Sequence, residues 1–155
     1  MSIEEQKINI LLHALKERYE AMHIIRKRVQ DFCIWVLGIL SSFAGIIFKV
    51  DINFNIGEKI IYSLAIFIIF IVVRFLYLAD LNKGFKSQQK VAVKIEKIIG
   101  LLEDNFIEGY DSVYPKKWEN SGNKKCEGNY FKSSHYLLYL GFLFILLAIW
   151  FANLM

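Results

Sequence analysis

The feature that most constrains this chain is a run of seventeen residues without a charge, Phe32 to Phe48 (FCIWVLGILSSFAGIIF). As an α-helix this run would measure about 25 Å, slightly less than the ~30 Å hydrocarbon core of a bilayer, so that flanking residues complete the crossing. Charges bound it on both sides, with Asp31 before it and Lys49 after it. We therefore predict a transmembrane helix over 32–48, with the segments before and after it on opposite sides of a membrane.

Two further runs reach the same length. The first covers 60–79 and is interrupted only by Arg74, and the second covers 135–155 and holds no Lys, Arg, Asp or Glu. Hydrophobic residues make up 55% of the chain, which exceeds what a soluble core of this size needs. A soluble bundle is the alternative, but its apolar helices would lack enough polar chain to cover them. We predict an all-α integral membrane protein with three transmembrane helices.

The basic residues predict the orientation. Six precede the first span and ten lie between the second and third spans, whereas the predicted outer turn, 49–59, holds two. The positive-inside rule places the N-terminus and the segment 80–134 in the cytoplasm, and the C-terminus outside. Anionic lipid headgroups are favoured over nucleic acid as the partner of these charges. The expected headgroup contacts are Arg26, Lys27, Arg28, Lys83, Lys86 and Lys132.

Two cytoplasmic helices are expected to extend the first two spans. Apolar residues recur at helical spacing over 1–31, Ser2 with Glu5 matches a capping box, and no Gly or Pro occurs before Gly38, so one helix should run to about residue 48. A second apolar stripe predicts a helix over 80–106. Because a short outer turn joins the spans, these extensions should pair as an antiparallel hairpin.

The segment 107–134 reads as a cytoplasmic loop, because Gly109, Pro115 and Gly122 interrupt its helical pattern. It is rich in aromatic residues, which predicts that it packs onto the helices or the membrane surface. Ser133 or Ser134 could cap the third span.

Within the spans, small residues are the feature that best indicates how the helices pack. Such residues let helices approach closely, either inside one protomer or between protomers, and we predict a homo-oligomer. Arg74 is the one charge inside a predicted span, and a snorkelling or paired side chain is favoured over a gating or ion-pathway role. The expected packing or oligomerisation residues are Gly38, Ser42 and Gly45 in the first span, and Gly141, Ala148 and Ala152 in the third.

The sequence offers no pattern of catalytic chemistry. It holds no phosphate-binding loop, nucleophile elbow or polar carboxylate cluster, so we expect neither an enzyme nor a cofactor. Glu20 and His23 form a Glu-x-x-His pair, but the second copy that a di-iron bundle requires is missing. Cys33 and Cys126 belong to no metal-binding pattern and should be free thiols facing a reducing compartment. No metal site is predicted.

A basic amphipathic helix runs directly into the first span over Glu17 to Phe48 (ERYEAMHIIRKRVQDFCIWVLGILSSFAGIIF), and a short turn, a second span and a lysine-rich helix to about Phe106 follow. This layout resembles the SLATT group of small bacterial membrane proteins, found with antiphage and nucleotide-signalling systems. That group typically has two spans, whereas this chain has three predicted spans. The resemblance implies a bacterial inner-membrane effector that oligomerises and disrupts membrane integrity once a cytoplasmic protein partner senses infection.

Two other functions stay open. One is an immunity or exclusion protein that blocks a pore-forming toxin or phage entry, and its contacts would lie in the membrane or in the outer turn. The other is a passive scaffold that anchors a cytoplasmic enzyme.

Overall fold

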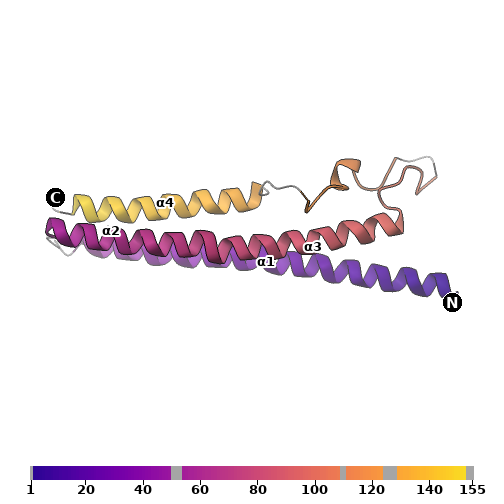
Figure 1. Ribbon diagram of the computed structural model, residues 1–155, viewed down its shortest axis with the longest axis horizontal. Helices are drawn as coiled ribbons and strands as arrows, with labels where there is room; N and C mark the ends of the chain where they lie inside the picture. The colour runs from indigo at the N-terminus through magenta and orange to yellow at the C-terminus, as the bar shows by residue number, and fades with distance from the viewer. Residues whose placement is uncertain (1, 50–53, 109–110, 124–128, 153–155) are drawn as a thin grey trace. The chain divides into compact units, whose positions relative to one another are not determined.

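The computed structural model describes residues 2–49, 54–108, 111–123 and 129–152, and all its regular elements are helical (Figure 1). Three stretches of helix are long and apolar enough to cross a membrane, within Ile3–Lys49, Ile56–Ile99 and Tyr130–Phe151. The predicted all-α architecture and its three long apolar helices are therefore confirmed. The helices are α1 (Ile3–Lys49), α2 (Ile56–Ile71), the π-helical η1 (Val72–Tyr77), α3 (Leu78–Ile99), the 3-10 helix η2 (Lys116–Trp118) and α4 (Asn129–Phe151).

Two helices begin as local hydrogen bonding dictates. The predicted capping box of α1 is present, with Glu5 N donating to Ser2 Oγ at 3.2 Å and Ser2 N donating to a Glu5 carboxylate oxygen at 2.7 Å. A second capping box, between Asn55 and Glu58, starts α2. That helix therefore begins four residues before the predicted start at 60, and Lys59 belongs to its first turn rather than to the outer turn. Residues 50–53 of the predicted turn lie outside the described residues.

The helix predicted to run to residue 106 ends at Ile99. Gly100 has a φ of +90°, Leu101 N donates to Glu96 O at 3.0 Å, and Gly100 N donates to Lys97 O at 3.2 Å. These two bonds form a Schellman motif, in which a glycine in the left-handed region closes the helix. The prediction was too long because it followed the apolar stripe through this glycine.

The third long apolar helix begins at Asn129, six residues before the predicted start at 135. Ser134 lies inside this helix, and its Oγ donates to Tyr130 O at 3.0 Å. Bonding back to a carbonyl four residues earlier is typical of a serine within a helix rather than at its N-cap. The predicted serine cap was therefore misplaced.

The chain divides into two compact units. We call residues 1–27 and 81–127 the polar unit, and residues 28–80 and 128–155 the apolar unit. The helix α1 contributes to both units without a break.

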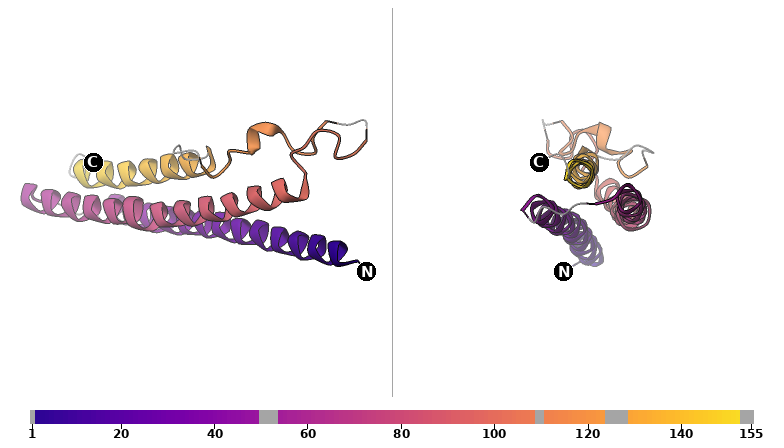
Figure 2. Two further views of the ribbon diagram at one scale, coloured as in Figure 1. Left: turned by 45° about the vertical axis from the view of Figure 1, so that its right-hand side comes forward. Right: turned by 90° about the vertical axis from the view of Figure 1, so that its left-hand side faces the viewer.

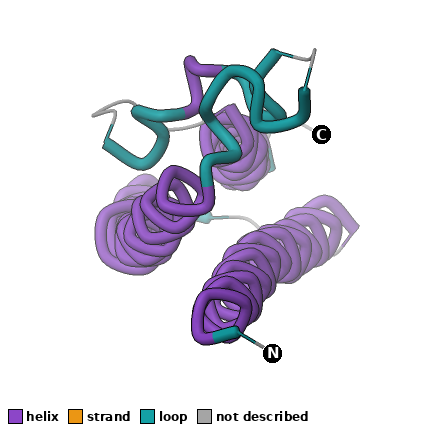
Figure 3. Tube along the Cα trace, turned by 90° about the vertical axis from the view of Figure 1, so that its right-hand side faces the viewer, coloured by secondary structure: helices purple, strands orange, loops and turns teal. Residues whose placement is uncertain are grey.

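In the polar unit, the first part of α1 lies antiparallel to α3. Tyr19 bonds Glu96, whereas Arg26, seven residues later in α1, lies over the ring of Phe85, eleven residues earlier in α3. Along this contact the apolar stripes of the two helices bury Leu15, Met22, Ala92 and Ile95, and Leu102 is buried just beyond the end of α3. After α3 the chain folds back along that helix (Figure 1). Figure 3 shows the loop that continues from the end of α3.

In the apolar unit, α1, α2 and α4 surround a common core, and an end-on view shows them as three neighbouring helices (Figure 2). Two contacts for each pair set the directions. Leu37 faces Gly141 and Phe48 contacts Phe144, so α4 runs parallel to α1. Lys59 contacts Trp150 and Phe70 contacts Phe142, so α4 runs antiparallel to α2. The core includes Cys33, Ala44, Leu78, Phe142, Ile145, Ala148 and Ile149.

Candidate functional site

The small residues of α4 are used inside the protomer. Gly141 is buried, and a Cβ added to it would lie 2.5 Å from Leu37 Cδ2 and 3.4 Å from Leu40 Cδ1. Ala148 is fully buried, and Ala152, one turn later, is partly exposed. The absent side chain at Gly141 therefore leaves the space that the leucines of α1 occupy.

The small residues of α1 lie on the opposite side of that helix from its buried side chains. A Cβ added to Gly38 or Gly45 would meet no atom within 4 Å. Ser42 is exposed, and its Oγ donates to Gly38 O of the same helix at 2.8 Å. Within the described part of the chain, Gly38 and Gly45 therefore make no close contact with another helix, and Ser42 is exposed beside them.

These residues contribute to an open apolar groove of about 530 Å³. Large apolar side chains border it, among them Trp35, which is 72% exposed. The face thus combines small residues with large ones in neighbouring turns of one helix. The lining residues are Ile34, Trp35, Gly38, Ile39, Ser42, Phe43 and Ile46.

Arg74 lies within the π-helical segment, and π-helical insertions often occur at functional sites. Its Nε donates to Tyr139 Oη of α4 at 3.1 Å, and its guanidinium lies 5.5 Å from the centroid of the Phe75 ring. The side chain thus contacts a hydroxyl and an aromatic ring, which fits the favoured interpretation of a paired structural charge.

A second cation ties α2 to α4, and the sequence analysis missed it. Lys59 is only 7% exposed, and its Nζ donates to Trp150 O at 3.0 Å. Trp150 Nε1 in turn donates to Ser63 Oγ at 3.1 Å. The ammonium group of Lys59 thus lies at the last turn of α4. A lysine in this place donates to a carbonyl that has no partner within the helix, and it interacts favourably with the negative end of the helix dipole. The sequence did not predict this contact, because the lysine and the tryptophan are ninety-one residues apart.

Most residues predicted to contact lipid headgroups have exposed side chains: Lys27, Arg28, Lys83 and Lys132 are exposed, and Lys86 is partly exposed. Arg26 is exposed as well, but its guanidinium also lies 5.0 Å from the centroid of the Phe85 ring within the polar unit. No headgroup is needed to explain its position.

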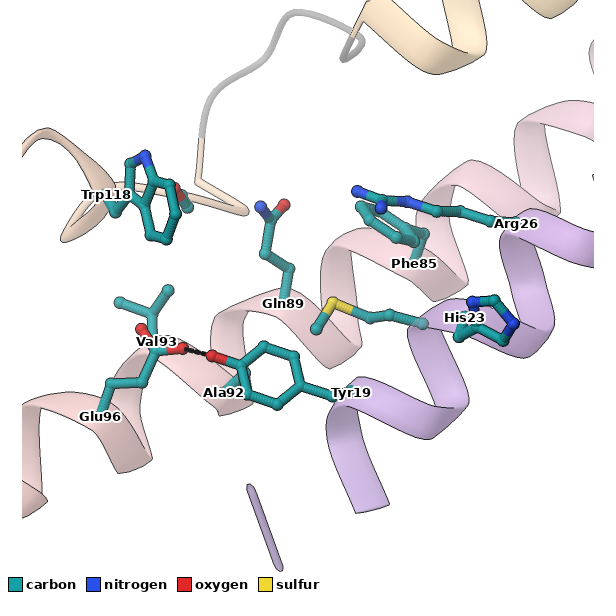
Figure 4. A pocket seen from close by; sticks show the side chains of 11 residues that line it. Tyr19, His23, Arg26, Phe85, Gln89, Ala92, Val93, Glu96 and Trp118 are labelled. Carbon is teal, nitrogen blue, oxygen red and sulfur yellow. Dashed lines mark hydrogen bonds between the residues drawn. The ribbon is translucent and has the colours of Figure 1, made fainter. Parts of the chain in front are cut away.

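The polar unit holds a cavity of about 330 Å³, bounded by α1, α3 and the chain after α3 (Figure 4). Its polar groups include Tyr19, His23, Arg26, Gln89 and Glu96. Glu96 is 4% exposed, and Tyr19 Oη donates to its Oε1 at 2.5 Å. Burial first, and then the bond to Glu96, raise the pKa of Tyr19 well above its usual range, so its hydroxyl stays protonated and remains a donor.

Trp118 and Ser121 form the cavity wall opposite the helices. A Cβ added to Gly122, whose φ is +80°, would lie 2.9 Å from the backbone N of Lys90. Lys97 Nζ donates to Glu119 Oε1 at 2.5 Å, and this bond raises the pKa of Lys97 and lowers that of Glu119. The wall therefore packs directly against α3, as the aromatic content of this segment predicts.

Among the described residues, no group of three or more His, Cys, Asp or Glu side chains is placed to hold a metal ion. His13 and Glu17 form an exposed pair at 3.5 Å. Cys33 is a buried free thiol, and Cys126 lies outside the described residues. Comparison with protein-family models, curated proteins and solved structures found no match to this chain.

Proposed function

We propose that the chain is an integral membrane protein whose three long apolar helices span the bilayer, with the N-terminus and the polar unit in the cytoplasm and the C-terminus outside. The outward face of α2 supports insertion, because Ile61, Leu64 and Ile68 are each more than half exposed. A soluble protein rarely leaves so continuous an apolar surface in water, whereas lipid covers it at no cost. The basic residues, sixteen in the assigned cytoplasmic segments against two in the outer turn, support the orientation.

The orientation predicts that Cys126 is cytoplasmic. In intact cells a membrane-impermeant thiol reagent should leave it unlabelled, and lysis should expose it. Cys33→Ala supplies a background in which Cys126 is the one thiol. Labelling of Cys126 in this variant without lysis would contradict the orientation.

Within that membrane, we propose an oligomeric effector that perturbs membrane integrity when a cytoplasmic protein partner triggers it. The observation that carries this proposal is that a single helix, α1, holds both the open groove at Gly38 and one side of the polar cavity at Tyr19. The groove face carries both small and large residues. In two copies related by a two-fold axis, the large side chains of each copy could therefore pack against the small residues of the other. The layout of the chain from Glu17 to about Phe106 resembles the SLATT group, and this resemblance adds the bacterial inner membrane and antiphage defence as its setting.

The proposed coupling is mechanical. A partner that tilts or rotates the N-terminal part of α1 also moves its apolar part, because α1 has no break between Ile3 and Lys49. That movement disturbs the packing of copies at the groove and opens defects through which ions leak. The cost of exposing backbone or Arg74 to lipid keeps this state rare until the partner binds.

Two glycines inserted after Val29 test this mechanism, because they uncouple the two parts of α1. We expect triggered depolarisation, read with a membrane-potential dye, to be lost at unchanged abundance in the membrane. Two alanines at the same place are the control for changed register, and alanine preserves the stiffness of the helix. Full depolarisation in the glycine variant would reject the coupling.

Expression of the wild type separates this function from the two alternatives. Growth arrest with depolarisation under the proper trigger supports the effector. Protection of cells against a pore-forming toxin or a phage, without depolarisation, would favour immunity or exclusion. Absence of either phenotype would favour a passive anchor.

A further inference from the structure

Glu96 is a buried carboxylate that faces the polar cavity without a cationic partner. It is 4% exposed, and its recorded hydrogen bond comes from the neutral hydroxyl of Tyr19. Among the described residues, none of the ion pairs involves Glu96. A buried carboxylate usually requires a cation close by or becomes protonated, because burial strips away the water that stabilises its charge.

The surroundings of Glu96 suit an organic cation. The ring of Tyr19 lies beside the carboxylate, and Trp118 projects from the opposite wall (Figure 4). Faces of Trp and Tyr rings attract ammonium groups, also at sites such as this one where the rings are partly open to solvent. Met22, Ala92 and Val93 line the cavity as well, so an aliphatic chain attached to the cation would also be covered.

The positive group already in the cavity does not pair with the carboxylate of Glu96. The Arg26 guanidinium lies over the Phe85 ring, at the end of the cavity away from Glu96 (Figure 4). A hard metal ion would need several oxygen ligands, and the cavity lining supplies one carboxylate. Its volume of about 330 Å³ is at the lower end of the usual range for small-molecule sites.

We propose that the polar cavity binds a small molecule with an alkylammonium head, which pairs with Glu96 between Tyr19 and Trp118 while its aliphatic tail lies over Met22 and Ala92. The ammonium supplies the charge that the buried carboxylate lacks. Arg26 repels a second positive group at the other end, so the fitting ligand carries one ammonium. This site is independent of the proposed effector function and can be tested without a trigger or a partner.

The test uses the full chain in neutral detergent micelles, with its three tryptophans labelled with ¹⁵N. n-Butylammonium is the probe, and 1-butanol is the neutral analogue of the same length. The indole N–H signal of Trp118, assigned with Trp118→Phe, should shift and saturate with n-butylammonium, whereas Trp35 and Trp150 lie outside the cavity lining and should not respond. Half-saturation should require at least about tenfold more 1-butanol, because charge-assisted hydrogen bonds are roughly twice as strong as neutral ones.

Glu96→Gln should weaken n-butylammonium binding at least about tenfold, since it removes the charge but keeps an oxygen for Tyr19. Glu103→Gln removes the same charge from an exposed position of the polar unit and should leave binding unchanged. If circular dichroism shows that Glu96→Gln has lost helicity, the proposal is tested instead by the affinities of the wild type for n-butylammonium and 1-butanol. Equal responses to both probes, no shift of Trp118, or equal affinity in a folded Glu96→Gln variant would overturn the proposal.

Discussion

The apolar unit carries glycines on two faces that differ in what surrounds them. At Gly141 of α4 the space of a side chain is already taken by Leu37, whereas at Gly38 and Gly45 of α1 that space is open. The same residue type thus has two roles. On α4 it allows close packing within one protomer, and on α1 it leaves an open apolar groove. A small-residue pattern predicts that helices can approach, but it does not say which helix approaches.

The largest expected effect comes from adding a side chain at Gly141, where the space is already taken. Gly141→Leu should destabilise the protomer by about 3 kcal/mol, because overpacking forces Leu37 and the α4 backbone apart. The free energy of unfolding in a denaturing detergent titration measures it. Leu37→Ala, combined with Gly141→Leu, should recover part of the loss, since it returns space to the same contact. Stability equal to that of the wild type would mean that α1 and α4 do not pack at Gly141.

The same substitution on the open face should act on assembly instead. Gly38→Leu or Gly45→Leu should not lower the unfolding free energy, because both positions are exposed and leucine favours a helix more than glycine does. Each should weaken self-association about tenfold, or ~1.4 kcal/mol, because a bulky side chain holds the copies apart. Sedimentation in detergent gives the mass. Unchanged mass in both variants would move the interface elsewhere, and a monomeric wild type would remove it.

The smallest expected effect concerns the polar contact that ties α4 to α2. Lys59→Met keeps most of the aliphatic length but loses the hydrogen bond to Trp150 O, so it should cost about 1 kcal/mol of unfolding free energy. Lys49→Met is the matched control, because Lys49 is an exposed lysine at the end of α1. Equal stability of the two variants would show that the hydrogen bond from Lys59 to Trp150 O does not help to hold α4 in place.

The helix ends show how far local sequence reasoning reaches. The capping box of Ser2 and Glu5 was predicted and is present, because its partners are three residues apart. The end of α3 at Ile99 was also available from sequence, since Gly100 is a residue that commonly closes helices. The apolar stripe beyond it, which includes the buried Leu102, favoured a longer helix. In a sequence pattern, an apolar residue that is buried after a turn looks the same as an apolar residue buried on the face of a helix.

The candidate sites were predictable only in part. Gly38, Ser42 and Gly141 were identified as packing residues, and Arg74 as a charge inside an apolar helix, because residue type and spacing carry that information. The bond from Lys59 to Trp150 was missed, since its partners are ninety-one residues apart. Glu96 was not singled out from the sequence, because its bond to Tyr19 and its place in the cavity with Trp118 join residues far apart in the chain.

The sequence by itself determined that the chain forms three long apolar helices, where the charges lie along it, and that α1 has no helix-breaking residue before Gly38. Helix formation and hydrophobic length depend on neighbouring residues, which a single sequence displays in full. Only the tertiary structure decided that Gly141 is filled while Gly38 is open, that Lys59 is buried, and that Glu96 faces a cavity. Each of these depends on which side of a helix meets another helix, and contacts between residues far apart in the chain settle that choice.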